Sequence, residues 1–384
     1  MIISQLILNN WKNFRHINVT LGDRVFVVGP NAAGKSNFLD VFRFLRDLVK
    51  PAGGLQAALE SRGGLSKIRC LAARKNPQVE IEIGLSEGVG GEEIWRYSLG
   101  IKKEPKGQHL SIIDYEKVWH AGKLILNRPD EEDLSDKLRL TQTHLEQINA
   151  NKRFRDVAIF LQEIQYLHLV PQAIRHPIAF VGKILPDDPY GQDFLKRLSD
   201  TSERSRDSRL RKIEEALRGV VPQLTRLSYT KDDMGKPHLE ALYEHWRPRG
   251  AKQLEDQFSD GTLRMIGLLW SLLDKDSVLL LEEPELSLHT GIVRRLPAIM
   301  SRLNRKSKRQ IMLSTHSPEL LADGGIGGEE VLLLEPSTEG TQIKLATDYN
   351  DIRALLEQGL SAADAILPKI TQFSSLPLWQ ELDE

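Results

Sequence analysis

The stretch GPNAAGKS at residues 29–36 decides the fold of this chain. It fits the pattern G-x-x-x-x-G-K-[ST], in which successive backbone N–H groups wrap a phosphate. The preceding run RVFVV at 24–28 is short and rich in β-branched residues, which predicts a strand. The following run SNFLDVFRFLRDLVK at 36–50 has apolar residues at helical spacing and stops before Pro51. A strand, a glycine-rich turn and a helix in this order predict a phosphate-binding loop.

Each residue type in this loop suits one part of a nucleoside triphosphate. Gly29 and Gly34 permit a tight turn and a close approach of the backbone. We expect Lys35 to bridge the β- and γ-phosphates of ATP and the Ser36 hydroxyl to ligate Mg²⁺. The predicted nucleotide-binding residues are Gly29, Pro30, Asn31, Ala32, Ala33, Gly34, Lys35, Ser36 and Asn37.

Two further apolar runs end in polar side chains. In VLLLEEPELSLH at 278–289, an apolar run predicts a buried strand that ends at Glu282 and Glu283. Beside a triphosphate, Glu282 would hold Mg²⁺ through a water, and Glu283 would polarise the attacking water as the catalytic base. In IMLSTHSPE at 311–319, His316 follows another strand, at the edge where ligands bind in open α/β sheets. We expect His316 to sense the γ-phosphate.

The heptapeptide FSDGTLR at 258–264 predicts a second anion site. A polar and glycine-containing run precedes the apolar LRMIGLLWSLL, which is typical of a helix start. Free N–H groups at a helix N-terminus bind anions, so Ser259, Asp260 and Gly261 are candidate phosphate contacts. Two phosphate sites far apart on one chain are understandable if ATP joins two chains.

Composition narrows the class of protein. The chain has 384 residues and a formal net charge of −1 at pH 7, so no overall basic field indicates nucleic-acid binding. The single cysteine, Cys70, forms no intramolecular disulfide and suits a reducing compartment. The N-terminus lacks a signal-peptide pattern, and no apolar run approaches the about 20 residues that a membrane span needs. We therefore expect a cytoplasmic protein without a membrane partner.

Between the two halves of the predicted nucleotide site, the pattern changes twice. QVEIEIGL, IWRYSLGIKK and SIIDYEKVWHAGKLIL predict antiparallel hairpins. The acidic run RPDEEDLSD at 128–136 favours a solvated turn. The runs RFRDVAIFLQEI, GQDFLKRL and SRLRKIEEALRGVV then predict helices within 141–222, and single strands and one helix over 290–304 return toward the end.

These patterns predict an α/β fold with a mixed, mainly parallel core sheet, an antiparallel β subdomain and an inserted helical lobe. The head would be built from the two ends of the chain, with the other parts inserted between them. The expected segments are the N-terminal half of the head at 1–77, the antiparallel β region at 78–140, the helical lobe at 141–222, the C-terminal half of the head at 223–349, and a weakly helical tail at 350–384.

Together the motifs resemble the ABC-type ATPase heads of the SMC, RecF and OLD-nuclease group. The phosphate loop GPNAAGKS, the signature FSDGTLR, the strand LLLEEPELSLH and the switch histidine in STHSP occur in that group's order and separation. The opening QLILNNWKNFRHI is similar to its first strand, where a short Asn/Phe/Arg segment lies near the nucleotide. The resemblance covers both ends of the chain with specific motifs, and the middle in general character only.

The resemblance implies an ATPase that uses ATP and Mg²⁺ and assembles with itself. In this group the signature helix caps the γ-phosphate of ATP held by a second copy, so Ser259, Asp260 and Gly261 are expected to bind in trans, in a homodimer or higher oligomer. Breaking the β–γ bond would remove charge from the joint and let it open. Asp260 replaces the usual second glycine, and its carboxylate suits a γ-phosphate site only if it points away or caps its helix.

Other family positions are carried over as follows. The glutamine that reaches Mg²⁺ in the family is assigned to Gln147, with Gln142 as the alternative. Glu282 stands where an aspartate is commoner, which implies a looser magnesium geometry. Arg62 and Arg69 are either ATP contacts or solvent-exposed side chains.

The motifs also separate possible biological roles. EEPELSLH differs from the DEPT style of transporter subunits, and the stretch after His316 shows no paired acidic motif of a nuclease domain. The chain best resembles the compact standalone ATPases of bacterial anti-phage defence systems, which control a separate effector, a nuclease or toxin. The alternative is a RecF-like DNA-binding ATPase in repair or recombination. Nucleic acid would then meet SERSRDSRLRK at 202–212 or SRLNRKSKR at 301–309, which otherwise are ordinary charged helix faces.

Overall fold

The computed structural model describes residues 1–73, 78–104, 110–176, 188–244, 251–274, 277–304 and 309–374. The chain divides into two compact units, which we name after the motifs they carry. The phosphate-loop unit comprises Met1–Ile164, Arg309–His316 and Ile326–Glu384, and the signature unit comprises Gln165–Lys308 and Ser317–Gly325. The boundaries of the five segments expected from the sequence stay a prediction.

A small sheet around β3 (Arg24–Val28) supports the phosphate loop. β3 pairs in parallel with β13 (Ile311–Thr315) and with β14 (Val331–Glu335), while β15 (Gln342–Leu345) pairs antiparallel with β14. Residues 25–28 are all buried, as expected for a strand covered on both faces. This arrangement agrees with the mixed, mainly parallel sheet predicted from the sequence, and the predicted α/β fold class is confirmed.

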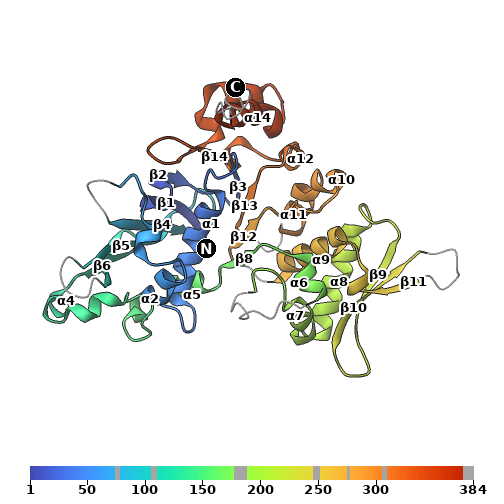
Figure 1. The fold of residues 1–384 in the computed structure, drawn as a ribbon, viewed down its shortest axis with the longest axis horizontal. Coiled ribbons are helices and arrows are strands. Elements are labelled where there is room, and N and C mark those ends of the chain that lie inside the picture. Colours follow the sequence, from blue (N-terminus) through green and yellow to red (C-terminus); the bar gives the residue numbers. More distant parts are fainter. Residues whose placement is uncertain are drawn as a thin grey trace, which may run out of the picture. The chain divides into compact units, whose positions relative to one another are not determined.

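An antiparallel sheet with the strand order β2-β1-β4-β5-β6-β7 completes the strands of this unit. In β4, the side chains of Val79, Ile81, Ile83 and Leu85 are buried, which is the period of two that the sequence shows. Figure 1 shows β4, β5 and β6 side by side. The strands are β1 (Ile2–Trp11), β2 (Phe14–Thr20), β4 (Val79–Ser86), β5 (Glu93–Lys103), β6 (Ser111–His120) and β7 (Lys123–Arg128).

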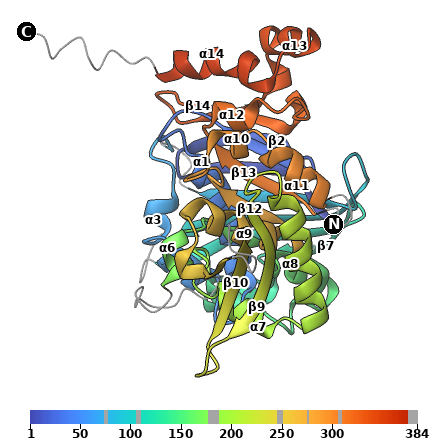
Figure 2. The same ribbon diagram turned by 90° about the vertical axis from the view of Figure 1, so that its right-hand side faces the viewer.

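The helices of the phosphate-loop unit include the long α1, which follows the loop and ends one residue before Lys50. Two helices, α13 and α14, contact each other where the sequence indicates one weak helix (Figure 2). The helices are α1 (Lys35–Val49), α2 (Leu55–Glu60), α3 (Leu65–Ile68), α4 (Glu131–Ser135), α5 (Arg155–Gln162), α13 (Asn350–Glu357) and α14 (Ala362–Ser374), with 3-10 turns at Lys137–Thr141, Asn151–Arg153, Gly328–Glu330 and Ala346–Asp348.

The acidic run at 128–136 is not the solvated turn that its charge favours. Its centre forms α4, which Asp130 caps by accepting a hydrogen bond of 2.9 Å from the Asp133 N–H. The Asp133 carboxylate is fully buried and accepts two hydrogen bonds of 2.8 Å from Arg128, whose side chain is also buried. Most other side chains of the run are exposed, as expected, but the interpretation was wrong for Asp133, because an ion pair within the run lets this side chain turn inward.

The signature unit contains a parallel strand pair and a separate antiparallel sheet. β8 (Gln165–Leu167) pairs in parallel with β12 (Leu279–Glu282), so both strands end at the same edge. In the antiparallel sheet, β10 lies between β9 and β11, and α8 runs beside β9 (Figure 2). The remaining elements are β9 (Leu224–Lys231), β10 (Pro237–Tyr243), β11 (Ala251–Leu254), α6 (Pro171–Arg175), α7 (Phe194–Asp200), α8 (Glu203–Leu217), a 3-10 turn at Glu255–Gln257, α9 (Asp260–Asp274), α10 (Thr290–Val293), α11 (Leu296–Asn304) and α12 (Pro318–Leu321).

The sequence predicts a helix after the heptapeptide at 258–264 and another over 290–304, both in this unit. α9 follows the heptapeptide as expected, and its residues 262–272 are all buried, which agrees with an apolar sequence on every face. The single helix expected over 290–304 is instead divided into α10 and α11. Pro297 at the start of α11 explains the division, because proline is tolerated in the first turn of a helix but not in its interior.

Candidate nucleotide site

The phosphate loop has the backbone conformation that an anion cradle needs. Ala32 and Gly34 adopt left-handed φ values of 61° and 101°, which turn successive N–H groups inward. A Cβ atom at Gly34 would lie 2.1 Å from Asn13 Nδ2, and a Cβ atom at Gly29 would lie 2.9 Å from Leu334 Cβ. Both glycines are therefore required by space, and Gly34 also by its backbone angle.

Lys35 and Ser36 are the first two residues of α1 and directly follow the turn of the phosphate loop. The Lys35 side chain is buried, and its Nζ donates to the carbonyl oxygens of Gly29 and Pro30 at 2.9 and 3.1 Å. Ser36 is exposed in the first turn, and that turn contains no acidic residue that would repel a phosphate. The loop thus presents a cation, a hydroxyl and a helix N-terminus together, which fits a triphosphate with its magnesium ion.

Asn13, in the turn between β1 and β2, braces the loop from outside. Its Nδ2 donates to the Ala33 carbonyl oxygen and to Thr341 Oγ1, both at 2.8 Å. Its Oδ1 accepts from Asn37 Nδ2, also at 2.8 Å. The side chain thereby joins the later part of the loop and the first turn of α1 to the hairpin between β14 and β15. Sequence reasoning named the NNWKNF segment only by resemblance and did not single out Asn13.

The structure places His316 beside the phosphate loop. β13 pairs in parallel with β3, and Thr315 lies opposite Val28 in that register. Because His316 follows Thr315 directly and Gly29 follows Val28, the exposed histidine and the start of the loop lie at the same sheet edge. This placement agrees with the position expected of a γ-phosphate sensor.

Arg62 does not point to a nucleotide. Its guanidinium donates two hydrogen bonds of 2.9 Å to the Asp40 carboxylate and forms an ion pair of 2.9 Å with Asp47, and only 9% of its side chain is exposed. Burial alone would raise the pKa values of both aspartates, but Arg62, with Lys12 at Asp40, holds the pKa of Asp40 below its usual value. We correct the assignment of Arg62: it anchors α2 to α1.

Arg69 remains a candidate ATP contact. Its side chain is exposed, and its backbone forms an isolated antiparallel bridge with Trp11, two residues before Asn13. The neighbouring Lys12 N–H donates to the Ile68 carbonyl oxygen at 2.5 Å. Arg69 therefore lies beside the turn that braces the loop.

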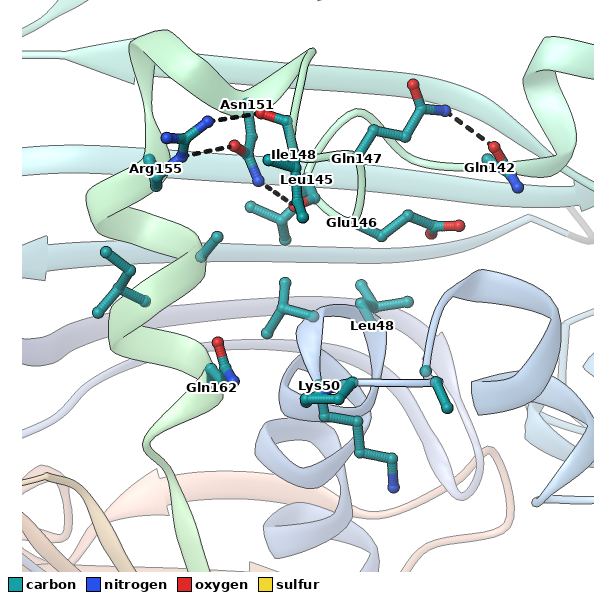
Figure 3. Close-up of a pocket in the computed structure, with 16 residues that line it drawn as sticks. Leu48, Lys50, Gln142, Leu145, Glu146, Gln147, Ile148, Asn151, Arg155 and Gln162 are labelled. Carbon is teal, nitrogen blue, oxygen red and sulfur yellow. Dashed lines mark hydrogen bonds between the residues drawn. The ribbon is translucent and has the colours of Figure 1, made fainter.

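Gln147 and its alternative Gln142 are placed away from Ser36. Both line a pocket of about 640 Å³ together with Leu48 and Lys50, at the C-terminal end of α1 (Figure 3). Ser36 lies in the first turn of the same helix, about 20 Å away at 1.5 Å per residue. Gln147 Nε2 donates to Gln142 Oε1 at 3.1 Å, so the two side chains bind each other. The structure contradicts both assignments as magnesium ligand.

In the signature unit, Ser259 begins the α9 helix as its cap. Its Oγ accepts a hydrogen bond of 3.2 Å from the Thr262 N–H, and its carbonyl oxygen accepts from the Leu263 N–H at 3.0 Å. Gly261 comes close to the loop after β12, because an added Cβ would lie 3.1 Å from the Ser287 carbonyl oxygen. Ser259 is exposed, so the tip of the helix is accessible.

The carboxylate of Asp260 is held by two partners on α6. Arg175 forms an ion pair of 2.6 Å with it, and Gln172 Nε2 donates to it at 2.7 Å. Arg175 also donates to the Phe258 carbonyl oxygen at 2.7 Å. The negative charge at the position of the usual glycine is therefore neutralised inside the unit. Sequence reasoning missed Arg175, because no local pattern links it to Asp260.

The carboxylate pair stands at the end of β12. Tyr166 on the paired strand β8 donates its hydroxyl hydrogen bond to Glu282 Oε2, which orients the proposed magnesium carboxylate. Glu283 follows with a left-handed φ of 44°, and both glutamates are half-buried. Non-glycine residues in this conformation cluster at functional sites. Sequence reasoning missed Tyr166, because it expected helices over 141–222 and placed no strand at β8.

The two basic clusters are partly committed to internal contacts. In the first, Arg206 stacks over the Tyr229 ring at 3.9 Å, and Arg209 forms an ion pair of 2.6 Å with Asp274. In the second, Arg309 is fully buried, while residues 305–308 lie outside the described residues. These contacts favour structural roles for Arg206, Arg209 and Arg309, whereas Arg204, Arg211, Lys212 and Arg302 are exposed.

Two features are absent from the described residues, a membrane-spanning helix and a metal cage. Within them, no helix is long and apolar enough to cross a membrane. No group of three or more His, Cys, Asp or Glu side chains in the same part of the chain forms a ready metal cage. A magnesium ion that travels with ATP needs no such cage, because phosphate oxygens and waters supply most of its ligands.

The fold and the loop define a P-loop ATPase with an ABC-type head. The chain belongs to the family described as "AAA domain, putative AbiEii toxin, Type IV TA system", which matches residues 24–322, more than half of its length. No curated protein matches it in sequence. The solved structure described as "Crystal structure of the SmcHead bound to the C-winged helix domain of ScpA" matches with a TM-score of 0.55 at 13% identity, over 90% of this chain and 98% of that one.

Two other SMC heads are also similar to this chain. The head domain from Thermotoga maritima has a TM-score of 0.47 at 15% identity, over 90% of this chain and 99% of its own. The head with an extended coiled coil, bound to a ScpA domain derived from Pyrococcus furiosus, has a TM-score of 0.48 at 13% identity, over 93% and 98%.

Proposed function

We propose that this protein hydrolyses ATP with Mg²⁺, assembles head to tail around shared ATP, and serves as the sensor or scaffold ATPase of a bacterial anti-phage defence system. It would control a separate effector, a nuclease or toxin. The observation that carries the ATPase proposal is the braced loop, in which Gly34 turns the backbone and Lys35 opens the helix. The family membership supports the same activity.

The proposed chemistry assigns one task to each residue. Lys35 exchanges its hydrogen bonds to the loop carbonyls for the β- and γ-phosphates. Ser36 and Glu282 hold the magnesium ion, which neutralises charge on the phosphates when bound. Glu283 polarises the attacking water as general base, and His316 donates a hydrogen bond to the γ-phosphate.

The proposed assembly uses the tip of α9 as a second phosphate site. The capped N-terminus at Ser259 and the close approach at Gly261 present N–H groups that are suited to an anion. The Arg175 ion pair supports this use of the site, because it removes the repulsion that a free Asp260 would exert on a γ-phosphate. ATP bound by one copy would then be capped by the other.

The proposed role in defence rests on the resemblance and on the family description, which names a toxin system. A toxin-linked ATPase is useful as a switch: the ATP-bound assembly holds the effector, and hydrolysis alters the joint that holds it. The internal contacts of Arg206 and Arg209 give a DNA clamp no support.

The ATPase is tested with two substitutions. Lys35→Ala should lose ATP affinity in a binding titration. Glu283→Gln should still bind ATP but hydrolyse it at least about 100-fold more slowly, and it should accumulate as an ATP-dependent oligomer in light scattering. Glu357→Gln, an exposed glutamate on α13, is the matched control. Wild-type turnover by Glu283→Gln would exclude this residue as the base.

The trans arrangement is tested by mixing two inactive variants. Ser259→Arg and Lys35→Ala should each fail to hydrolyse ATP alone. Their mixed dimer contains one complete site, built from the loop of the first variant and the signature of the second. Recovery of hydrolysis on mixing supports the shared site, whereas full activity of Ser259→Arg by itself at low protein concentration refutes it.

The biological role is tested through the partner. We expect the product of a neighbouring gene to co-purify with Glu283→Gln in ATP and to be released from the wild type as ATP is hydrolysed. Salt-dependent binding of duplex DNA by the purified protein, without such a partner, would instead establish the RecF-like alternative.

A further inference from the structure

Arg264 connects the signature helix to the residue proposed as catalytic base. It lies on α9 one turn after Gly261, and only 5% of the residue is exposed. Its Nη1 donates to the Glu283 carbonyl oxygen at 3.3 Å, and its Nη2 donates to the Leu169 carbonyl oxygen. One guanidinium thus joins three segments of the signature unit: α9, the loop after β12 and the loop after β8.

The loop after β12 is held in an unusual conformation at this contact. Glu283 and Ser287 both have left-handed φ values, of 44° and 63°. Such conformations persist in non-glycine residues only when the surroundings enforce them. Arg264 holds the first end of this loop, and Gly261 touches its other end at the Ser287 carbonyl oxygen. The signature helix therefore contacts the loop at two points.

The choice of a buried arginine is informative. Burial of a cation is costly, and buried cations usually pair with a carboxylate. The hydrogen bonds of Arg264 go to two backbone carbonyl oxygens on different loops, and its planar fork suits two fixed acceptors. Burial lowers the pKa of Arg264, and the charges of Glu285, Asp260 and Glu283 oppose that effect. An aliphatic side chain would pack here without fixing either loop, so the guanidinium serves position more than packing.

We propose that Arg264 is a positioning residue that fixes Glu283 relative to the signature helix. Engagement of Ser259 and Gly261 by a phosphate of one ATP is thereby transmitted to the base that acts on the other ATP, the one held by the same chain. This inference rests on the proposed function and adds to it a route between the two sites. It predicts that hydrolysis of one ATP is faster when the α9 tip of the same chain is occupied by the other ATP, and that a dimer holding a single ATP keeps a slower basal rate.

The first experiment compares Arg264→Met with Arg209→Met. Arg209 anchors the opposite end of α9, where it donates to the Asp274 carboxylate and carbonyl oxygen at 2.6 and 3.1 Å, so it is a matched structural control. Arg264→Met should lower the single-turnover hydrolysis rate by about 10–100-fold, because small misplacements of catalytic groups have effects of this size. ATP affinity should change less than about twofold, because the loss lies in positioning.

Arg264→Lys serves as the conservative variant. It keeps the cation but loses the planar fork, so it should recover part of the rate, and it carries the test if Arg264→Met does not fold. Equal single-turnover rates for Arg264→Met, or for a folded Arg264→Lys, and Arg209→Met would overturn the inference. Absence of hydrolysis by the wild-type protein would instead refute the proposed function, so the two failures are distinguishable.

A second experiment asks in which chain Arg264 acts. In mixed dimers with Lys35→Ala, only one chain holds ATP. Placing Arg264→Met on the chain with the intact loop should lower the basal hydrolysis of that single ATP, because the Glu283 of that chain acts, whereas placing it on the Lys35→Ala chain should leave the basal rate unchanged. If Arg264→Met instead lowers hydrolysis only when placed on the Lys35→Ala chain, Arg264 acts through the α9 tip that contacts the partner's ATP, and the proposed link to Glu283 of its own chain is wrong.

Discussion

Replacing Asn13 by alanine tests whether the phosphate loop depends on its brace. The side chain makes three hydrogen bonds of 2.8 Å, to Ala33, Thr341 and Asn37. Each contributes about 1 kcal/mol net, so their loss removes about 3 kcal/mol in total. If all of this stabilises the binding-competent loop, the ATP dissociation constant rises about 100-fold, since 1.4 kcal/mol is a factor of ten. This value is an upper limit.

Two further variants isolate the cause. Asn9→Ala removes a side chain on the preceding strand, β1. Asn9 binds Glu80 at 2.6 Å and does not contact the loop, so ATP affinity should stay near that of the wild type. Asn13→Asp keeps the acceptor for Asn37 but turns a carboxylate toward the Ala33 carbonyl oxygen. Repulsion should make Asn13→Asp bind ATP more weakly than Asn13→Ala.

The assay is an equilibrium titration with ATP at low protein concentration, so that assembly does not contribute to the affinity. Urea unfolding of each variant, monitored in parallel, separates loop effects from general loss of stability. If Asn13→Ala and Asn9→Ala bind ATP equally tightly, the hydrogen bonds of Asn13 do not organise the loop, and the reasoning fails.

Three other predictions concern stability and magnesium. Arg62→Met should destabilise the protein by about 3–5 kcal/mol at pH 7, because it leaves buried carboxylates without their arginine. The pKa values of Asp40 and Asp47 are lowered in the folded protein, so the ionised carboxylates stabilise the fold fully above about pH 4 and lose this effect as the pH falls through their folded-state pKa values. The urea midpoints of the wild type and of Arg62→Met should therefore converge in acid. A difference that stays constant with pH would contradict the ion pairs of Arg62 with Asp40 and Asp47. Tyr166→Phe should raise the Mg²⁺ concentration for half-maximal hydrolysis about tenfold, and an unchanged magnesium titration excludes Tyr166 as support for Glu282. Asp133→Ala should cost about 3 kcal/mol in urea unfolding without changing ATP affinity, because the buried Arg128 loses one carboxylate partner and keeps Glu116.

The sequence predicts those parts of the site that are local in the chain. The phosphate loop, β3 and α1 are contiguous, so one pattern with its flanks defines all three. The placement of His316 is also predictable, because a residue that follows a parallel strand lies at the same sheet edge as the loop that follows its neighbour. In both cases the spacing along the chain fixes the position in space.

Side chains whose partners are distant in sequence were not predictable. Arg62 lies 22 positions after Asp40, and its exposure depends on how α2 packs against α1. Gln147 follows the antiparallel sheet, whose strand lengths decide which end of α1 it reaches. The acidic run at 128–136 has the composition of a surface turn, and only the buried Arg128 shows why Asp133 turns inward. The composition of a segment predicts its average exposure, whereas a single ion-pair partner can determine whether one side chain in it is buried.

Asp260 stands where the family pattern has a second glycine, and its contacts explain how the site can accommodate a carboxylate. Taken alone, a carboxylate at the tip of α9 argues against a phosphate site, because like charges repel. An acidic residue in the first turn nevertheless stabilises the helix start, and Arg175 with Gln172 neutralises and orients its charge. The N–H groups at Ser259 and Gly261, which we propose to bind an anion, therefore need not compete with it. Asp260 and Arg175 therefore act as a pair, which anchors the start of α9 to α6 and leaves the N–H groups at the tip of α9 open to an anion.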